Sequence, residues 1–245
     1  MGKERIGGEA VALIRLHFIV EGQTEEAFVN EVLGPALATF GVFTDAQRIT
    51  TGRRHGRVYR GGFVAYEHLA RDLVRRMKED AAANSWFTTM VDYYRLPSDF
   101  PGHAETPSHI PAAQRAVSLE AAFIGDVAGR LTGMEVVSRF IPYIQVHEFE
   151  ALLFTDPAAF AEAFPDAPDV VGSLQSIRAQ FDTPEHIDEG PATAPSKRIA
   201  AILPDYEKPI SGLLIAQRIG VAAMRRECPL FDSWFTRLEA LGHSD

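Results

Sequence analysis

Residues 13–20 read Leu-Ile-Arg-Leu-His-Phe-Ile-Val, and residues 21–26 continue as Glu-Gly-Gln-Thr-Glu-Glu. A short, nearly continuous apolar run with branched side chains is typical of a strand buried on both faces of a parallel sheet. The run ends at Glu21, and Gly22 permits a tight turn. Thr24 is the expected N-cap of a following helix, and Glu25 suits the positive end of that helix dipole. This stretch predicts the strand, turn and helix that open an α/β fold.

Further segments alternate between strand and helix patterns. Strands are expected at 13–20, 42–50, 86–91 and 140–146, helices at 24–40, 66–82 and 112–131, loops at 51–62 and 95–111, and several short helices between 158 and 241. This alternation implies a parallel sheet with right-handed crossovers. We therefore expect a Rossmann-like α/β core of about four strands flanked by helices over residues 13–155, after a flexible leader over 1–12. Residues 156–245 should form a helical extension packed on the core.

The bulk composition restricts the class of protein. The formal net charge is -9, so the chain is not a general coat for nucleic acid, although a nuclease with locally concentrated basic residues is compatible with it. The single cysteine, Cys228, excludes a disulfide framework within the chain and fits a reducing cytosol. Its apolar neighbours predict a buried, inert thiol. No apolar run approaches the about 20 residues of a membrane span, so we expect a cytoplasmic protein.

Acidic residues follow three of the four expected strands. Glu21, Asp92 and Glu148 stand at these strand ends, with Glu25 and Glu150 close behind. Ligands of parallel sheets collect beyond the carboxyl ends of the strands, and carboxylates that converge there repel each other unless cations separate them. Oxygen ligands favour Mg²⁺ or Mn²⁺. Taken singly, Glu25 is explained by the helix dipole and Asp92 by a turn, so the prediction depends on the convergence.

The segment His147-Glu148-Phe149-Glu150 resembles a zinc peptidase motif only superficially. That motif needs two histidines four residues apart on one helical face, and position 151 is Ala. A zinc peptidase is therefore not expected. Instead, His147 is expected to orient a carboxylate or to cap a short helix over 149–154.

Basic residues gather at three places that suit contacts with phosphate. These are Arg53, Arg54, Arg57 and Arg60 in the loop at 51–62, Ser196, Lys197 and Arg198 at an expected helix start, and Lys208 after Tyr206. Arginines on a loop suit a phosphodiester backbone, and helix N-termini bind phosphate. A solvated connector and ordinary surface ion pairs are the alternatives.

Several motifs resemble one uncharacterised bacterial family. They are Phe18–Glu26 (FIVEGQTEE), Val91–Pro97 (VDYYRLP), Gln145–Phe154 (QVHEFEALLF), Pro195–Ile199 (PSKRI), Tyr206–Lys208 (YEK) and Cys228–Trp234 (CPLFDSW). Together they resemble the family called domain of unknown function 4276, over nearly the whole chain from about Leu13. That family is toprim-like, which implies a toprim-like α/β fold related to the overcoming-lysogenization-defect nucleases.

The resemblance implies roles for particular residues. Glu21 and Asp92 match the two hallmark acids of the toprim fold, and Glu25 matches a further acid of its nuclease branch. The second Asp of the toprim Asp-x-Asp motif is replaced by Tyr94, a poor Mg²⁺ ligand because its hydroxyl pKa is about 10. Either Glu148 or Glu150 then replaces the missing carboxylate, or a second metal is weak or absent. The resemblance also implies genes near ATPases and a role in phage defence or mobile elements.

The leading hypothesis is a Mg²⁺- or Mn²⁺-dependent phosphodiesterase, a nuclease acting on DNA or RNA. Glu21, Asp92 and Lys197 would be catalytic, with Glu21 as a candidate base and Lys197 or a loop arginine stabilising the developing charge. One alternative is a non-catalytic toprim-like module that docks on an ATPase partner of the AAA or ABC type. Another is a small-molecule phosphohydrolase. A homodimer is compatible with each hypothesis, and the sequence leaves the substrate and partner open.

Overall fold

A computed structural model describes residues 13–54, 57–60, 65–107, 109–167, 169–187, 190 and 192–243, with only the backbone path for 52–54 and 57–60. The expected leader at 1–12 lies outside the described residues. The strands are β1 (Ile14–Val20), β2 (Val42–Arg48), β3 (Thr50–Arg54), β4 (Arg57–Arg60), β5 (Ser85–Asp92), β6 (Phe140–Ile141) and β7 (Ile144–Gln145). The α-helices are α1 (Gln23–Phe28), α2 (Gly34–Ala38), α3 (Tyr66–Glu79), α4 (Ala112–Arg130), α5 (Phe160–Ala163), α6 (Asp169–Arg178), α7 (Pro195–Ile202), α8 (Leu213–Glu227) and α9 (Pro229–Glu239).

Shorter helical turns connect these elements. The 3₁₀ turns are η2 (Tyr93–Arg95), η3 (Glu135–Arg139), η4 (Phe149–Thr155), η5 (Pro157–Ala159), η6 (Pro184–His186) and η8 (Ala240–His243). Two π-helical turns, η1 (Val29–Leu33) and η7 (Lys208–Gly212), precede α2 and α8.

The main sheet is parallel and has the order β2-β1-β5-β6, with β7 also paired to β5. In register, Val20 of β1 lies between Arg48 of β2 and Met90 of β5. The predicted α/β fold class is confirmed, but the sheet has five strands instead of about four. The reason is Pro142, which lacks an N–H and falls between β6 and β7. Beside this break, the Tyr143 N–H donates to Thr89 Oγ1 at 3.1 Å.

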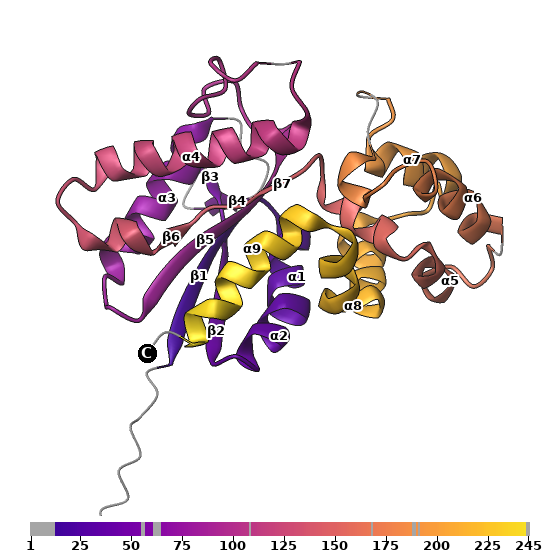
Figure 1. The fold of residues 1–245 in the computed structure, drawn as a ribbon, viewed down its shortest axis with the longest axis horizontal. Coiled ribbons are helices and arrows are strands. Elements are labelled where there is room, and N and C mark those ends of the chain that lie inside the picture. Colours follow the sequence, from indigo (N-terminus) through magenta and orange to yellow (C-terminus); the bar gives the residue numbers. More distant parts are fainter. Residues whose placement is uncertain are drawn as a thin grey trace, which may run out of the picture.

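Helices cover both faces of the sheet (Figure 1). α3 and α4 lie on one face, whereas α1, α2 and α9 lie on the other. Adjacent residues of β1 point to opposite faces of the sheet. Phe18 packs in the helix layer that contains α9, and Ile19 packs in the layer that contains α3. Both side chains are fully buried. The carboxyl ends of β1 and β5 therefore emerge between two packed layers, which gives side chains there a rigid base.

The predicted short helices form a group beside the sheet, made of α5, α6, α7 and α8 (Figure 1). α9 then returns to the sheet. Trp234 on α9 donates its indole N–H to Thr88 Oγ1 of β5 at 3.0 Å and stacks on Tyr143 with ring centroids 4.1 Å apart. The end of the chain thus contributes to the same core as its beginning.

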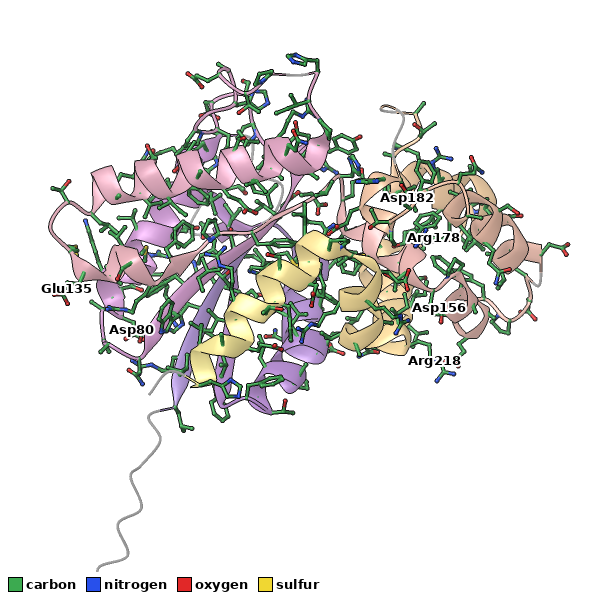
Figure 2. The ribbon with its side chains drawn as sticks, viewed as in Figure 1. Asp80, Glu135, Asp156, Arg178, Asp182 and Arg218 are labelled. Atoms are coloured by element: carbon green, nitrogen blue, oxygen red, sulfur yellow. The ribbon has the colours of Figure 1, made fainter. Side chains whose placement is uncertain are left out.

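Polar contacts tie the outer elements together, and Figure 2 labels several of them. Arg178 on α6 donates to Glu227 of α8 at 3.0 Å, and the Asp156 carboxylate accepts from the Ala158 N–H at 3.0 Å. Asp80 pairs with Arg15 at 2.8 Å at the amino end of the sheet. None of the described helices has the length and apolarity that crossing a membrane requires.

Two local predictions were wrong. Thr24 is not an N-cap: the cap position is Gly22, and no side chain caps α1. The expected loop at 51–62 instead contains the antiparallel pair β3 and β4, in which Arg54 is opposite Arg57. The glycines of this segment suggested a connector, but the cross-strand pairing that makes it a hairpin is not visible in a local pattern.

Candidate active site

Four carboxyl side chains meet at the carboxyl edge of the sheet. They belong to Glu21, Glu25, Asp92 and Glu150, and we call them the acidic cluster. All four are buried, between 2% and 8% exposed. The Lys208 ammonium lies among three of them, 3.1 Å from Glu25 Oε1, 3.1 Å from Asp92 Oδ2 and 3.2 Å from Glu150 Oε2. Of the three strand-end acids expected to converge, Glu21 and Asp92 lie in the cluster and Glu148 does not.

Strand pairing places Glu21 and Asp92 side by side. Glu21 directly follows β1, and its N–H donates to Met90 of the neighbouring β5 at 3.3 Å. The Asp92 N–H in turn faces Glu21 Oε2 at 3.4 Å. Gly22 lets the chain turn closely over this edge: a Cβ there would lie only 3.0 Å from Glu25 Oε2. The turn thus brings Glu25, on α1, back toward Glu21.

A strained turn delivers Glu150. His147 has φ of 60°, which is uncommon for a residue other than glycine. The chain bends there, and the Phe149 N–H donates to Asp92 Oδ1 at 2.9 Å. Glu150 follows inside η4 and is directed to the same ammonium as Asp92. Such strained residues often persist at functional sites, where the surrounding structure holds them.

Lys208 comes from the helical extension. It begins η7, which packs against α1. Its Nζ also lies 5.5 Å from the centre of the Phe149 ring. The ammonium is therefore contacted by three carboxylates and one aromatic ring, which belong to β5, α1 and η4. The sequence predicted Lys208 as a phosphate contact, whereas in this arrangement its charge is directed to carboxylates of its own chain.

The cluster is electrically unbalanced, since it holds four carboxyl groups and one ammonium, which contacts three of them. Burial, then the charge of Glu25, raises the pKa of Glu21 to about 7. Burial also raises the pKa of Asp92 and Glu150, against the attraction of Lys208. Burial opposes the charge on Lys208, but Asp92, Glu150 and Glu25 hold its pKa well above the usual range. The site therefore resists full ionisation of its acids, and an additional cation would favour their charged forms.

A cavity of about 440 Å³ opens beside the cluster. It is lined by Tyr94, Arg95, Glu148, Ala194, Ser196 and Lys197. Arg95 Nε lies 3.9 Å from Glu21 Oε1, which connects the cavity to the cluster. Glu148 does not reach Lys208; its Oε2 accepts the Ser196 N–H at 3.0 Å, at the N-terminus of α7. Of the two acids predicted to complete a metal shell, the structure brings Glu150 into the cluster and places Glu148 on the cavity wall.

The other predicted phosphate contacts are dispersed. Arg198 donates to Thr193 O at 2.8 Å and lies over the Phe181 ring at 5.5 Å, so it is anchored within the extension. The side chains of Arg53, Arg54, Arg57 and Arg60 lie outside the described residues. The chain runs from β2 through Ile49 into β3, the first strand of their hairpin. The Ile49 N–H donates to Val20 O at 3.0 Å, so the hairpin begins at the edge of the sheet where β1 ends.

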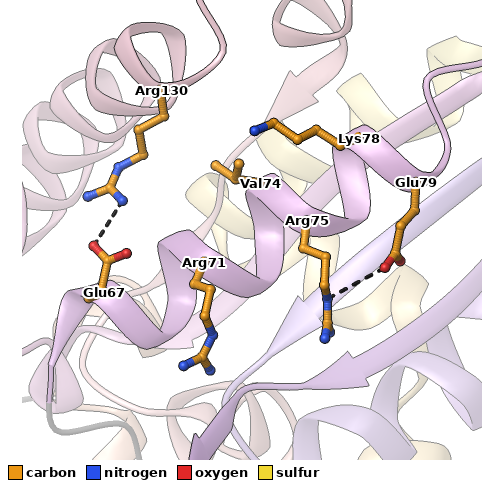
Figure 3. Close-up of a pocket in the computed structure, with 7 residues that line it drawn as sticks. All are labelled: Glu67, Arg71, Val74, Arg75, Lys78, Glu79 and Arg130. Atoms are coloured by element: carbon orange, nitrogen blue, oxygen red, sulfur yellow. Dashed lines mark hydrogen bonds and ion pairs between the residues drawn. The ribbon is translucent and has the colours of Figure 1, made fainter.

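A larger hollow of about 600 Å³ lies between α3 and α4 and shares no residue with the cluster (Figure 3). Its charges are largely paired: Arg130 lies 2.8 Å from Glu67, and Arg75 lies 3.8 Å from Glu79. Lys78 also lines it and is exposed. We read this hollow as an ion-paired helix face, and it has none of the buried, mutually repelling groups that mark the cluster.

One family model covers the sequence motifs described above, apart from Phe18 and Ile19. The model described as "Domain of unknown function (DUF4276)" matches residues 20–239. The chain belongs to this family. The match confirms the family predicted from the sequence, and it includes every member of the acidic cluster.

Two further comparisons set this DUF4276 chain against curated proteins and solved structures. No curated protein matches it. Among solved structures, it is similar to the C-terminal region of the Burkholderia pseudomallei OLD protein, with 12% identity, a TM-score of 0.43, and coverage of 94% of this chain and 98% of that one.

Sequence reasoning on this DUF4276 chain missed two residues near the cluster. Arg95 follows the Tyr93-Tyr94 pair and was read only as the start of a loop. The Tyr206 hydroxyl is buried without a hydrogen-bond partner among the described groups, and its pKa is raised by burial and by the charge of Glu150. The sequence signal for Tyr206 was its place in the motif Tyr206–Lys208, which was assigned to Lys208 alone.

Glu120 provides a comparison outside the cluster. Its Oε1 accepts the Ile144 N–H at 2.8 Å, and burial raises its pKa to about 7 from 4.5. The unfolded chain releases this proton near pH 4.5 and the folded chain near pH 7, so the free energy of unfolding falls as the pH rises between these values. We expect Glu120→Gln to raise the free energy of unfolding by on the order of 2 kcal/mol at pH 8 and to leave it unchanged at pH 4. Urea unfolding at the two pH values measures this, and an equal effect at both would contradict the assignment.

Proposed function

We propose that the acidic cluster binds Mg²⁺ or Mn²⁺ and that the protein is a metal-dependent phosphodiesterase acting on nucleic acid. The observation that carries the proposal is the meeting of four buried carboxyl groups, from the residue after β1 and from α1, β5 and η4, of which three contact a single ammonium. Burying this many acids costs free energy, and a fold that needed only Lys208 neutralised would require fewer of them.

The chemistry of the cluster's donor atoms can be compared with what a divalent ion prefers. All donors are carboxylate oxygens, which suits Mg²⁺ or Mn²⁺. Glu21 has the fewest short contacts: its Oε1 lies 3.9 Å from Arg95 and its Oε2 faces an N–H at 3.4 Å. However, no group of three or more His, Cys, Asp or Glu side chains is arranged to hold a metal ion within the described part of the chain. The residues fit the ion by chemistry and charge, and Lys208 separates them in this conformation.

Glu21, Glu25 and Asp92 are the residues that would hold the ion, with Glu150 behind them. A bound divalent ion would supply Lewis-acid polarisation of a phosphoryl group. The protein's own part is to fix the substrate beside this edge. Arg95 and Lys197 line the adjoining cavity and place positive charge where a phosphodiester would develop negative charge.

The basic residues and the motifs support a nucleic-acid polymer as the substrate. The hairpin β3–β4 carries four arginines in sequence and extends its backbone past the edge where the cluster lies. Extended basic arms suit contacts with a continuous phosphodiester backbone. The toprim-like motifs at Glu21 and Asp92 support the same substrate class.

An assay with supercoiled plasmid and a labelled single-stranded oligonucleotide tests the proposal. We expect cleavage with Mn²⁺ or Mg²⁺ and none with EDTA. Cleavage of neither polymer at any metal concentration would contradict it. Hydrolysis of small phosphodiesters without cleavage of polymers would support a small-molecule phosphohydrolase instead.

Lys197→Met tests the cavity as the substrate site. We expect the cleavage rate to fall by about tenfold to a hundredfold, because a cation near the developing charge is lost. Lys78→Met is the matched control, since Lys78 is exposed in the hollow on α3 and should leave the rate unchanged. Equal rates for wild type and Lys197→Met would remove Lys197 from the site.

One observation favours a second candidate, a non-catalytic module that docks on an ATPase partner. Lys208 already neutralises part of the cluster, so the acids and the ammonium form an ion-pair network without any metal. This candidate predicts no Mn²⁺ binding and no cleavage, together with co-purification of an ATPase.

A further inference from the structure

A second cavity, of about 450 Å³, adjoins the turn at His147. Its walls include Arg115 on α4, His147, and Glu185 and His186 from η6. It lies where the amino end of α4 faces the helical group (Figure 1). The residue after His147 is Glu148, which lines the cavity beside the acidic cluster. Because consecutive Cα atoms are about 3.8 Å apart, the two cavities are neighbours across one stretch of backbone.

Aromatic rings connect the two cavities. The ring of Tyr94, in the wall of the cavity beside the cluster, lies 5.3 Å from the ring of His147, in the wall of the second cavity. Tyr93 follows at 6.1 Å from Tyr94 and packs against the core on the α3 side. The three rings, which we call the ring row, are tilted by 40° and 56° and so do not stack face to face on one another. A half-buried ring such as Tyr94 suits stacking by a flat partner.

The side chains that line the two cavities favour an anion. Arg95 and Lys197 line the first cavity and Arg115 lines the second, where its guanidinium carbon also lies 4.8 Å from the centre of the Tyr93 ring. The acids in the two walls are engaged by the protein itself. One oxygen of Glu148 accepts an N–H of α7, and both oxygens of Glu185 accept N–H groups of α9. A guanidinium in a cavity is suited to a phosphate group.

We infer that the second cavity and the ring row together bind a nucleotide of a single-stranded nucleic acid. Arg115 and the exposed His186 hold its phosphate, and its base stacks on Tyr94. In a duplex both faces of each base are covered by neighbouring bases, whereas an unpaired base offers a face to an aromatic side chain. A volume of about 450 Å³ is in the range of cavities that hold small organic ligands. The inference rests on the proposed nucleic-acid substrate and deepens it by naming a single strand.

Fluorescence anisotropy tests the inference with a labelled oligothymidylate of about 12 nucleotides and a duplex of the same length. The titrations are made in EDTA, so that binding is measured without cleavage. We expect the single strand to bind at least about tenfold more tightly than the duplex. Tyr94→Leu should weaken single-strand binding by about tenfold, and Tyr94→Phe should stay within about twofold of wild type, because the ring and not the hydroxyl stacks. Phe43→Leu is the matched control, since Phe43 is 48% exposed on β2 and should bind as wild type does.

Arg115→Met tests the phosphate contact through its salt dependence. The slope of the logarithm of single-strand affinity against the logarithm of NaCl concentration should become less steep by about 0.7, because one phosphate contact is lost. Arg218→Met is the matched control and should keep the wild-type slope, since Arg218 is 62% exposed and pairs with Glu162 at 2.8 Å. If Arg115→Met fails to fold, His186→Gln should still weaken single-strand binding by about threefold and leave duplex binding unchanged.

The outcomes separate this inference from the proposed catalysis. Equal affinity for single strand and duplex, or wild-type affinity in Tyr94→Leu, overturns the inference even if the protein cleaves nucleic acid. Thymidine monophosphate bound as tightly as the oligonucleotide also overturns it, because the cavity would then serve a free nucleotide. Single-strand binding that depends on Tyr94 and Arg115, without cleavage at any metal concentration, supports the inference and contradicts the proposed catalysis.

Discussion

Glu21→Gln should reduce metal-dependent cleavage by at least about a hundredfold and at the same time make the metal-free protein more stable. The activity falls because a neutral amide replaces the carboxylate with the fewest competing partners. The stability rises because Glu21 is charged at a buried site beside Glu25. An essential residue whose removal strengthens the fold is typical of a functional site.

The sign and pH range of the stability effect follow from the pKa of Glu21. The pKa of Glu21 is about 7 in the folded chain, whereas an ordinary glutamate has a pKa of 4.5. The folded protein therefore keeps this proton over a range in which the unfolded chain has released it, and wild type loses stability as the pH rises from 4.5 to 7. Glu21→Gln lacks this loss, which amounts to on the order of 2 kcal/mol at pH 8.

Urea unfolding in EDTA and plasmid cleavage with Mn²⁺ measure the two effects on the same preparations. Glu120→Gln is the matched control, because Glu120 is a half-buried glutamate with the same raised pKa of about 7 outside the cluster. It should gain stability in the same way and keep full activity. Cleavage by Glu21→Gln at the wild-type rate would contradict a catalytic role for Glu21. An equal loss of cleavage activity in Glu21→Gln and Glu120→Gln would contradict it as well.

The largest loss of stability is expected at a carboxylate that has no part in the proposed chemistry. Glu185 is 3% exposed, and its two oxygens accept the N–H groups of Leu230 at 3.0 Å and Phe231 at 2.9 Å. These are among the first N–H groups of α9, which have no partner within the helix. Glu185 thus caps, from η6, the helix that carries Trp234 to the sheet.

Glu185→Ala should lower the free energy of unfolding by about 3 kcal/mol, since two buried N–H groups lose their acceptor. For a chain of this size we expect a melting temperature lower by about 6–12 °C. Glu162→Ala is the control, because Glu162 pairs with Arg218 at 2.8 Å on the surface, with side chains 54% and 62% exposed. That variant should shift the melting temperature by less than about 2 °C. Similar shifts for the two variants would refute the capping role.

Much of the fold was predictable because its signals are local. The run at 13–20 is apolar on both faces, and β1 covers Ile14–Val20. The apolar stripe at 66–82 predicted α3, which covers Tyr66–Glu79. The strand at 140–146 was predicted as one element, and only the position of Pro142 inside it indicated the break between β6 and β7.

The acids of the site were predictable for a similar reason. Glu21 and Asp92 directly follow strands, and parallel neighbours end at the same edge of a sheet. The role of Lys208 was not predictable, because it depends on how an extension about 116 residues beyond Asp92 folds back over that edge. Glu148 and Glu150 are two residues apart, and the left-handed turn at His147 decides which of them enters the cluster. Glu185 gave no sequence signal, since its partners on α9 are 45 and 46 residues away.

The most direct test of the central claim is an isothermal titration of metal-free protein with Mn²⁺ at pH 8, for wild type and for Glu21→Gln. A cation-binding cluster predicts saturable binding of Mn²⁺ by the wild-type chain and at least about a tenfold loss of affinity in the variant. No saturable binding by wild type, or the same affinity in both proteins, would contradict cation binding by the cluster and leave only the ion pairs of Lys208 with Glu25, Asp92 and Glu150.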